Sequence, residues 1–482
     1  MRMRLSGRWL LGLLLGIGLW GGITVHADTT MVRWPVVQSL APRRCELTSS
    51  QTRLYQLNDV TMQMTPAGVA KGTKHWQRVG QVMVTQNNRL VTYWQVRQLR
   101  TGRRGWVAAD AVRIPGATDI GTPKQRPGAV DTQYQPTPAV TRAATAPSYL
   151  PLKGAGRYTT SRILFHATPA YMATQGLQNR PDTLLQRHGY RDHYHFKTAL
   201  YLPRQLGSRN LGDPQSATFS ADNQYLYVMY VNDQQVAGAD QTGWVVRYDW
   251  QRLMALGAGR SGQMAMLRLA AAHQFDGTVT AFDRRVLATV TVGPEFTAGH
   301  AQSLALNPKT NELWFIASTA QNQLASVARL NAQSLTPDLK LTFTTGGGRL
   351  GDELTFDEQG HAYYWTHASA LRNGRVNLYR GTISRTTGVH FTQLAQGLAN
   401  NPGYFAQSIG YNEVTRRLYL VADESITSLP AADLGHLAAN QVGEANFAGE
   451  REFEGLVFMH HQDTGFLLTN RGAEMMRMVV DK

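Results

Sequence analysis

Residues 453–458 read FEGLVF, and a second apolar run, FLL at residues 466–468, follows after a short polar turn. Four earlier stretches have the same form, in which Gln or Glu precedes a strand-like run, a small turn and a second apolar run. These four stretches begin at residues 214–219, 301–306, 352–356 and 406–411. From Gln302 onward, the leading residues of the stretches lie 51, 54 and 47 positions apart. A period of about 50 residues with strand–turn–strand units is typical of a β-propeller.

The repeat predicts five blades, and six is the alternative because 87 positions separate Gln215 from Gln302. We interpret the surplus as a helical insertion at residues 250–273, where apolar residues recur at helical spacing. The fifth unit has only three strand-like runs, so the ring needs one outer strand from the start of the domain. Residues 195–202 (HFKTALYL) fit that role, and such closure removes an open sheet edge. The sequence thus predicts an all-β protein with the propeller at residues 151–482.

The N-terminus has the pattern of a secretory signal peptide. Three arginines precede an apolar run at residues 9–20, and Val25 and Ala27 supply the small residues of a cleavage site. We predict a signal peptide at residues 1–27 and a secreted, extracellular protein, with an uncleaved anchor as the alternative. The apolar run is short for a bilayer span, and no later segment is apolar enough, so no span is expected after cleavage.

The basic character of the chain belongs to its front part. The net charge is +15; residues 28–150 carry 16 Lys/Arg and 6 Asp/Glu, whereas residues 151–482 carry 29 and 27. Outside a bacterial cell, the polyanions available to such a surface are teichoic acids and anionic lipid head groups, rather than nucleic acid. The alternative is that the charge serves solubility without a specific partner.

Residues 44–114 contain short β-like runs separated by close turns, which predicts a small barrel. TYWQVR at residues 92–97 and GWVAADAV at residues 105–112 resemble the end of bacterial SH3-like domains, which close with an aromatic strand, a basic turn and Gly-Trp-Val. The resemblance implies binding of a cell-wall polymer, peptidoglycan or teichoic acid. The candidate binding residues are Trp76, Tyr93, Trp94, Arg100, Arg103, Arg104 and Trp106. Alternatively, the aromatic residues among them fill the core of the barrel.

Residues 115–150 change in composition to Pro, Thr, Ala, Gly and Gln, with almost no clusters of branched aliphatic residues. Such a composition predicts a flexible linker between the SH3-like domain and the propeller. The single cysteine, Cys45, excludes an internal disulfide. Because Arg43 and Arg44 precede it, Cys45 is either a thiol of lowered pKa or a small apolar residue.

The innermost strand of each propeller blade runs along a central channel. The residues that lead the five units are therefore expected to form a ring of polar side chains there, namely Gln215, Gln302, Glu353, Gln407 and Glu454. Carboxylate and amide oxygens bind Ca²⁺, which makes Glu353 and Glu454 the candidate metal ligands. The alternative is a hydrated polar plug that satisfies itself by hydrogen bonds.

FEGL at residues 453–456 resembles the Glu-Gly-Leu inner strand of calcium-dependent propellers related to gluconolactonases and SdiA-regulated proteins. That resemblance implies a metal-dependent lactonase or esterase. Asp352, Glu353 and Glu454 also offer carboxyl groups for glycoside hydrolysis, but Gln215 and Gln302 occupy the equivalent places in the first units. Amides cannot transfer protons, so we discount that reaction and predict no catalytic residue.

Two further families of site are not indicated by the sequence. Neither a His-Glu-x-x-His pattern nor a Gly-x-Ser-x-Gly turn occurs, and the histidines, including the adjacent His460 and His461, are expected on surface loops. We therefore predict a secreted, cell-wall-associated binding protein whose propeller presents a face to a ligand or partner. The alternatives are a Ca²⁺-dependent hydrolase of lactonase or esterase type and a structural surface protein without a small ligand.

Overall fold

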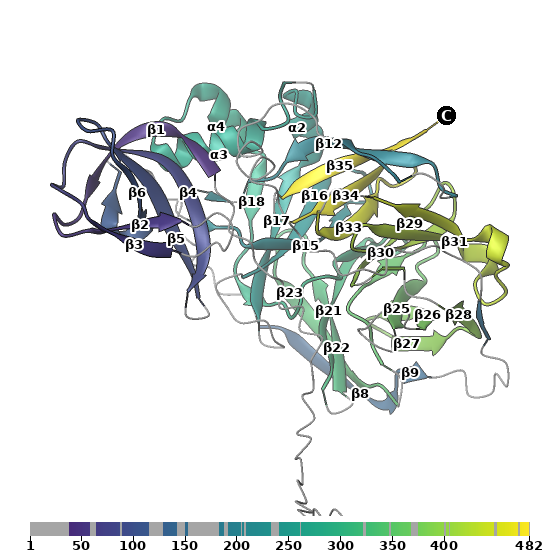
Figure 1. The fold of residues 1–482 in the computed structure, drawn as a ribbon. Helices are drawn as coiled ribbons and strands as arrows, with labels where there is room; N and C mark the ends of the chain where they lie inside the picture. Colours follow the sequence, from purple (N-terminus) through teal and green to yellow (C-terminus); the bar gives the residue numbers. More distant parts are fainter. Residues whose placement is uncertain are drawn as a thin grey trace, which may run out of the picture.

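The structure of the protein is a computed structural model in which two bodies of strands stand out, a propeller and a separate curled sheet (Figure 1). It describes residues 38–57, 64–86, 89–114, 129–141, 150–152, 183–187, 191–203, 205–206, 209–232, 241–260, 262–321, 324–346, 349–367, 375–399, 402–403, 405–447, 451–470 and 473–481. The predicted signal peptide at residues 1–27 lies outside these ranges. No helix within them is long and apolar enough to cross a bilayer.

The propeller has five blades, as predicted, and each is an antiparallel sheet counted from the channel outward. Blade one contains β15 (Asp213–Phe219), β16 (Tyr225–Val231), β17 (Thr242–Asp249) and β18 (Val290–Val292), with β19 (Phe296–Thr297) also on β17. Blade two contains β20 (Ala305–Asn307), β21 (Glu312–Gln321), β22 (Leu324–Leu330) and β23 (Pro337–Thr344). Blade three contains β24 (Thr355–Phe356), β25 (Ala362–His367), β26 (Val376–Ser384), β27 (Gly388–Gln393) and β28 (Gln396–Leu398).

Blade four contains β29 (Ala406–Asn412), β30 (Arg417–Ala422), β31 (Ser425–Pro430) and β32 (Gly443–Asn446). Blade five contains β33 (Phe453–Phe458), β34 (Gly465–Thr469), β35 (Glu474–Val480), β12 (Tyr194–Tyr201) and β11 (Thr183–Leu184). The second strands of the blades, such as β16 with the sequence YLYVMYV, are buried on both faces because each blade packs between two others. Such continuous runs of β-branched and aromatic residues suit strands covered on both sides.

The ring closes through β12, which confirms the predicted outer strand at residues 195–202. This strand precedes blade one in the chain but pairs antiparallel with β35 of blade five, with Leu200 opposite Met475. A buried ion pair supports the joint, because the Arg451 guanidinium contacts the Glu474 carboxylate at 2.8 Å. Thr198 donates a hydrogen bond to the same carboxylate at 2.9 Å. Both ends of the propeller sequence thus share one sheet.

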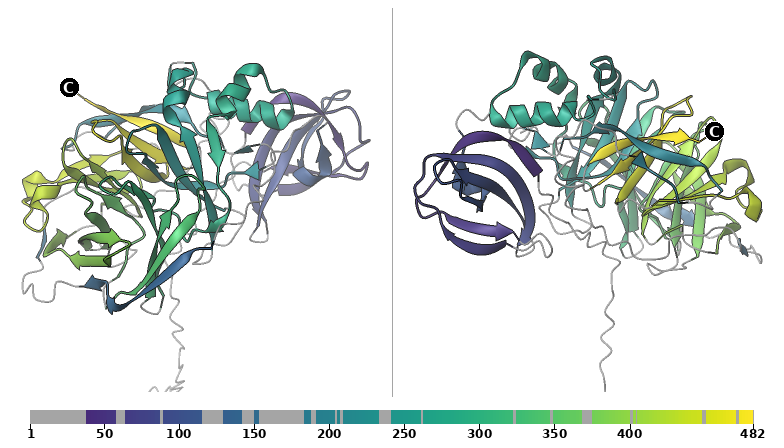
Figure 2. Two further views of the ribbon diagram at one scale, coloured as in Figure 1. Left: turned by 180° about the vertical axis from the view of Figure 1, so that it is seen from behind. Right: turned by 45° about the horizontal axis from the view of Figure 1, so that its top comes forward.

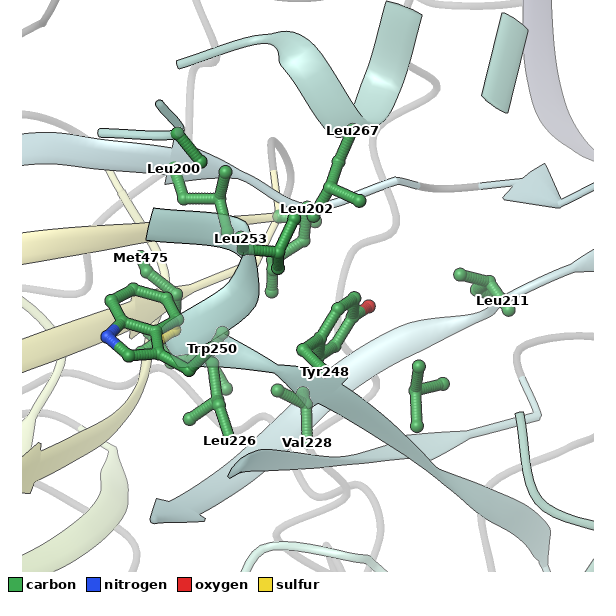
Figure 3. Packing of buried hydrophobic residues seen from close by; sticks show 14 of the residues in the cluster. Leu200, Leu202, Leu211, Leu226, Val228, Tyr248, Trp250, Leu253, Leu267 and Met475 are labelled. Atoms are coloured by element: carbon green, nitrogen blue, oxygen red, sulfur yellow. The ribbon is translucent and has the colours of Figure 1, made fainter. Parts of the chain in front are cut away.

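The predicted insertion between the third and fourth strands of blade one is helical. It contains α2 (Trp250–Ala255), α3 (Met266–Asp276) and α4 (Ala281–Leu287). In the cluster drawn in Figure 3, Trp250 and Leu253 of α2 and Leu267 of α3 lie among buried residues of β16, β12 and β35. Burial of each such side chain stabilises a fold by about 1.5–3 kcal/mol. The insertion is therefore part of the core that holds blade one to the closing strand.

The front of the chain forms a seven-stranded sheet that curls on itself (Figure 2). Its strands, in spatial order, are β3 (Met64–Val69), β2 (Arg53–Leu57), β6 (Arg104–Ala108), β5 (Arg89–Gln98), β4 (Trp76–Gln86), β1 (Gln38–Leu47) and β7 (Val112–Arg113). A single 3₁₀ turn at Ala109–Ala111 precedes β7. The curled sheet is consistent with the predicted small barrel, and membership of the SH3-like class stays a prediction.

The curled sheet touches the propeller through the helical insertion. The ring of Phe275, at the end of α3, meets the Trp94 ring edge-on with centroids 5.3 Å apart. The guanidinium of Arg78 in β4 lies over both rings, 5.6 Å from the Trp94 centroid and 5.2 Å from that of Phe275. Arg78 is buried in this contact, where cation–π attraction is stronger than at an exposed site.

Part of the segment predicted as a flexible linker at residues 115–150 is instead ordered strand, which corrects that prediction. β8 (Asp131–Pro138) pairs in parallel with β23 of blade two, and β9 (Val140–Thr141) pairs in parallel with β27 of blade three. β10 (Leu150–Leu152) adds to β28 in the same way. The outer strand of a blade offers unpaired backbone groups, and any extended segment can pair with them whatever its composition. Residues 115–128 and 142–149 lie outside the described part.

At Gly388 a side chain of the added strand β8 occupies the space of the missing Cβ atom. Gly388 has a φ of +83°, and a Cβ atom there would lie 1.2 Å from Nε2 of Gln135 in β8. Oε1 of Gln135 accepts a hydrogen bond from the Val389 amide at 3.1 Å. Only glycine tolerates both the backbone conformation and the close approach.

Candidate functional site

The five ring residues predicted from the repeat are all buried: Gln215, Gln302, Glu353, Gln407 and Glu454. Gln302 and Gln407 meet directly, because Nε2 of Gln302 donates to Oε1 of Gln407 at 2.8 Å. Blade three lies between the blades that carry these two glutamines, so this hydrogen bond reaches across the channel. Nε2 of Gln407 in turn donates to Asp423 at 2.9 Å. Two of the five ring side chains, Gln302 and Gln407, thus hydrogen-bond to each other in the channel.

In units one and two, the serine that follows the leading glutamine positions the start of the unit. The Ser216 hydroxyl donates to the carbonyl oxygen of Ala301 at 2.6 Å and accepts from the Leu304 amide at 3.1 Å, which ties blade one to blade two. The Ser303 hydroxyl accepts from the Ile316 amide at 2.8 Å inside blade two. The recurrent Gln-Ser pair therefore places one side chain in the channel and uses the next to position the strand.

Glu353 differs chemically from the glutamines of the ring. Burial and the neighbouring Asp352 charge raise the pKa of Glu353 from its ordinary value of 4.5 to about 8. Its Oε2 atom is buried and has no hydrogen-bond partner among the described residues. Glu353 therefore carries a proton at neutral pH, because desolvation disfavours its charged form.

The predicted Ca²⁺ site at Glu353 and Glu454 gains no support from this arrangement. Among the residues that the structure describes, no group of three His, Cys, Asp or Glu side chains is placed to hold a metal ion. Ca²⁺ favours six to eight oxygen ligands, with charged carboxylates among them. Here Glu353 is protonated and the Gln407 oxygen already accepts from Gln302. Because these residues do not fit the ion, we derive no step through a metal, and the site stays a prediction.

The aromatic residues proposed to bind wall polymer do not offer free faces. Trp76, Tyr93, Trp94 and Trp106 are all buried in the curled sheet. Trp76 donates its indole N–H to the Gly72 carbonyl at 2.9 Å, and Trp94 packs on Phe275. These rings are packed, as the alternative interpretation predicts: Trp76 and Trp94 belong to the main core of the curled sheet. Tyr93 and Trp106 belong to a second cluster with Val82, on the opposite face of the same strands.

The arginines predicted at the turn after β5 are exposed, together with a lysine from a neighbouring turn. We call this group the basic edge; it consists of Lys71, Arg100, Arg103 and Arg104. Arg103 donates to the carbonyl of Ala67 in β3 at 3.2 Å, and Nε2 of Gln98 donates to the carbonyl of Lys71 at 3.1 Å, which ties the two turns together. Within the described ranges, none of the four cations forms an ion pair. No acidic side chain of the described residues therefore neutralises the positive charge of the basic edge.

Cys45 is a packed side chain rather than a reactive thiol. Burial raises the pKa of Cys45 to about 11, and the nearby Arg78 charge offsets only part of that effect. The thiol belongs to the core of the curled sheet together with Leu47 and Leu54. Because the thiolate is the nucleophile, a thiol of such high pKa is inert at neutral pH.

A cavity of about 50 Å³ lies at the other end of the innermost strands, and we call it the channel cavity. Residues 217–218, 304–306, 354–356, 409–411 and 456–458 line it, together with Glu413, Met459 and His460. We expected His460 on a surface loop, and Glu413 had no predicted role. The repeat could have linked these two residues. Glu413 lies six positions after the ring residue Gln407, and His460 lies six positions after Glu454, so both occupy the same place in their units.

No known protein family matches the sequence, and no curated protein is similar to it. Among solved structures, a gluconolactonase from Xanthomonas campestris is similar over 62% of this chain and 95% of its own, with 10% sequence identity and a TM-score of 0.31. A TM-score at that level carries no argument about activity. The propeller rests on the strand pairing described above.

Proposed function

We propose that the protein is a secreted binding protein that holds anionic cell-wall polymer through its basic edge, while the propeller presents a second binding face. The observation that carries this proposal is the exposure of Lys71, Arg100, Arg103 and Arg104 on adjacent turns without an acidic partner in the described part. Residues 44–114 hold 11 Lys/Arg and only three Asp/Glu, so the imbalance extends over the whole curled sheet.

Electrostatics favours a polymeric anion at such an edge. Two unit charges about 4 Å apart in water interact by about 1 kcal/mol, and like charges repel by that amount. A polyanion such as a teichoic acid or the peptide carboxylates of peptidoglycan relieves the repulsion at several cations together. Each exposed contact is weak, on the order of 0.3–0.5 kcal/mol, so binding depends on their number. Salt weakens it, because the Debye length falls to about 10 Å at 0.1 M.

The proposal of a wall polymer rather than nucleic acid draws on the sequence. The pattern of a signal peptide at residues 1–27 predicts export, and the Gly-Trp-Val ending at residues 105–107 resembles wall-binding SH3-like domains. The buried aromatic residues take no part in the proposed contact, which leaves the arginines and the lysine as its chemistry.

The test uses the mature chain, residues 28–482, and purified bacterial cell walls in a co-sedimentation assay at low salt. We expect the triple variant Arg100→Gln/Arg103→Gln/Arg104→Gln to bind about tenfold more weakly, from three contacts of about 0.5 kcal/mol each. The matched control removes three exposed propeller arginines, Arg252→Gln/Arg260→Gln/Arg385→Gln. Equal loss in both triple variants, or no binding by the mature chain, contradicts the proposal.

A second proposal, metal-dependent hydrolysis of a lactone or ester in the channel, has one observation in its favour. Glu353 is a buried carboxyl that holds its proton at neutral pH, which is the state required of a general acid. A carboxyl cannot hold its proton as an acid and bind Ca²⁺ at the same time, so any Ca²⁺ would depend on Glu454. In that case Ca²⁺ raises the melting temperature of the wild type and leaves that of Glu454→Gln unchanged. A wild-type melting temperature that does not respond to Ca²⁺ rules this proposal out.

A further inference from the structure

The channel cavity is enclosed by the last residues of all five innermost strands. Apolar side chains line one part of it, among them Leu306, Leu354, Ile409, Leu456 and Phe458, while polar atoms form the larger share of its surface. The polar side chains of Glu413 and His460 lie at its end, on the turns that follow β29 and β33. A cavity of about 50 Å³ holds about four water-sized groups, at about 10–15 Å³ for each.

His460 is held in place by groups from two other blades. Its amide donates to Oδ1 of Asn223 at 2.8 Å, and its carbonyl oxygen accepts from Nδ2 of Asn223 at 3.0 Å. Its Nδ1 atom lies 2.6 Å from Oε1 of Glu413. Asn223 belongs to the turn after β15 and Glu413 to the turn after β29, so blades one, four and five meet at this histidine. Its ring orientation is therefore fixed from both sides.

Glu413 decides which nitrogen of His460 carries the hydrogen. Burial opposes the charge of Glu413, but the hydrogen bonds from His460 and from the His461 amide hold its pKa below the ordinary value. An ionised carboxylate accepts hydrogen bonds only, so Nδ1 of His460 must be the donor. In the neutral imidazole, Nε2 is then an acceptor with a free lone pair.

Nε2 of His460 is buried and has no hydrogen-bond partner among the described residues. The Tyr411 hydroxyl, also in the lining, is already engaged because it donates to Glu358 at 2.5 Å. A buried acceptor without a donor is unfavourable, and a ligand that supplies the donor gains that interaction. The cavity thus combines one oriented acceptor with a polar surface and a few apolar side chains.

We propose that the channel cavity binds the hydroxyl-bearing end of a small neutral ligand, such as a polyol or a sugar-like molecule. The ligand O–H donates to Nε2 of His460, and its carbon atoms contact Leu306, Ile409 and Leu456. The volume accommodates about four non-hydrogen atoms. The Glu413 carboxylate in the lining disfavours an anion, since like charges repel at short range. This site is separate from the basic edge and does not depend on wall binding.

The test compares two isomers, propan-1-ol and methyl ethyl ether, which share the formula C₃H₈O but differ in their ability to donate. The ¹⁵N-labelled mature chain is titrated with each, and the Nε2 resonance of His460 is followed by NMR together with the backbone amide resonances of Gly410 and Leu456, which line the cavity. We expect a saturable shift with the alcohol, at a half-saturation concentration about fivefold below that of the ether. A fivefold preference corresponds to one net hydrogen bond.

Two variants assign the effect to this nitrogen. His460→Phe keeps a ring of similar size but removes Nε2, so the preference for the alcohol, measured on the backbone amide resonances of Gly410 and Leu456, should be lost. His461→Phe is the matched control, because the adjacent His461 is exposed and also contacts Glu413 at 3.2 Å. If His460→Phe does not fold, the comparison of the two isomers on the wild type still tests whether the cavity prefers a hydrogen-bond donor. Equal half-saturation for the two isomers, or the absence of a saturable shift with the alcohol, overturns the proposal.

Discussion

Replacement of Glu353 by Gln should make the protein more stable at alkaline pH. The carboxyl of Glu353 has a pKa of about 8 in the folded state against an ordinary value of 4.5, because of burial and the charge of Asp352. A raised pKa means that the folded state holds a proton that the unfolded chain releases. The wild type therefore loses stability as the pH rises from about 4.5 to about 8, and the loss is complete above that range.

The size of the loss follows from the shift. Each pKa unit corresponds to about 1.4 kcal/mol, so a shift of about 3.5 units gives a loss on the order of 5 kcal/mol. Glu353→Gln removes the titrating group, although its new amide N–H₂ needs a partner and costs part of the gain. The sign of the difference at one pH is therefore less informative than its change with pH.

The assay is thermal unfolding of wild type and Glu353→Gln between pH 4.5 and pH 9. Because about 5 kcal/mol corresponds to about 10 °C for a domain of this size, the melting-temperature difference should move in favour of the variant by that amount. Asp352→Asn should lower the Glu353 pKa and shrink the pH dependence of the otherwise wild-type protein. A melting-temperature difference that is the same at pH 5 and pH 9 refutes the reasoning.

Three further predictions concern the rest of the chain. Cys45, with its pKa raised to about 11 by burial, should not react with a thiol reagent at pH 8 until the curled sheet unfolds; rapid native labelling would contradict this. Arg451→Met removes the ion pair of the buried Glu474 carboxylate and should lower the free energy of unfolding, measured in urea, by about 3–5 kcal/mol. The control Arg477→Met, at an exposed position, should lower it by less than about 0.5 kcal/mol. Gly388→Ala should displace β8 and expose residues 131–138 to limited proteolysis. The control is Gly72→Ala, at an open turn in the curled sheet, which should leave residues 131–138 protected.

The sequence alone was sufficient for the propeller and its closure. The strands repeat with a fixed period, and the fifth unit lacks an outer strand that residues 195–202 supply, so the topology followed from counting. The insertion at residues 250–273 was recognisable because the apolar spacing changes from two to about 3.6 residues. These signals are local in the sequence and need no knowledge of side-chain contacts.

The ordered part of the predicted linker could not be recognised in the same way. β8 and β9 are held by backbone hydrogen bonds to the outer edges of two blades, and composition carries little information on such pairing. The isolated Gly388 marks the crossing point, but only the structure shows that Gln135 occupies the space of its missing side chain.

The candidate site was predicted in part. The ring residues were found because they lead the repeat, yet the hydrogen bond between Gln302 and Gln407 depends on side-chain reach across the channel. The aromatic residues of the curled sheet could fill its core or bind a polymer, and the periodicity of the sequence does not distinguish these two roles. His460 and Glu413 went unrecognised because they come from separate turns that only the closed ring brings within 2.6 Å.

The most direct test of the proposed function is the salt concentration at which half of the mature protein leaves purified cell walls. We expect the wild type and the control variant Arg252→Gln/Arg260→Gln/Arg385→Gln to dissociate at the same concentration, because the control arginines lie outside the basic edge. The two triple variants have the same net charge, so a difference between them reports the position of the charge. The variant Arg100→Gln/Arg103→Gln/Arg104→Gln should dissociate at about half that concentration or below. Dissociation of both triple variants at the same salt concentration would contradict the assignment of wall binding to the basic edge.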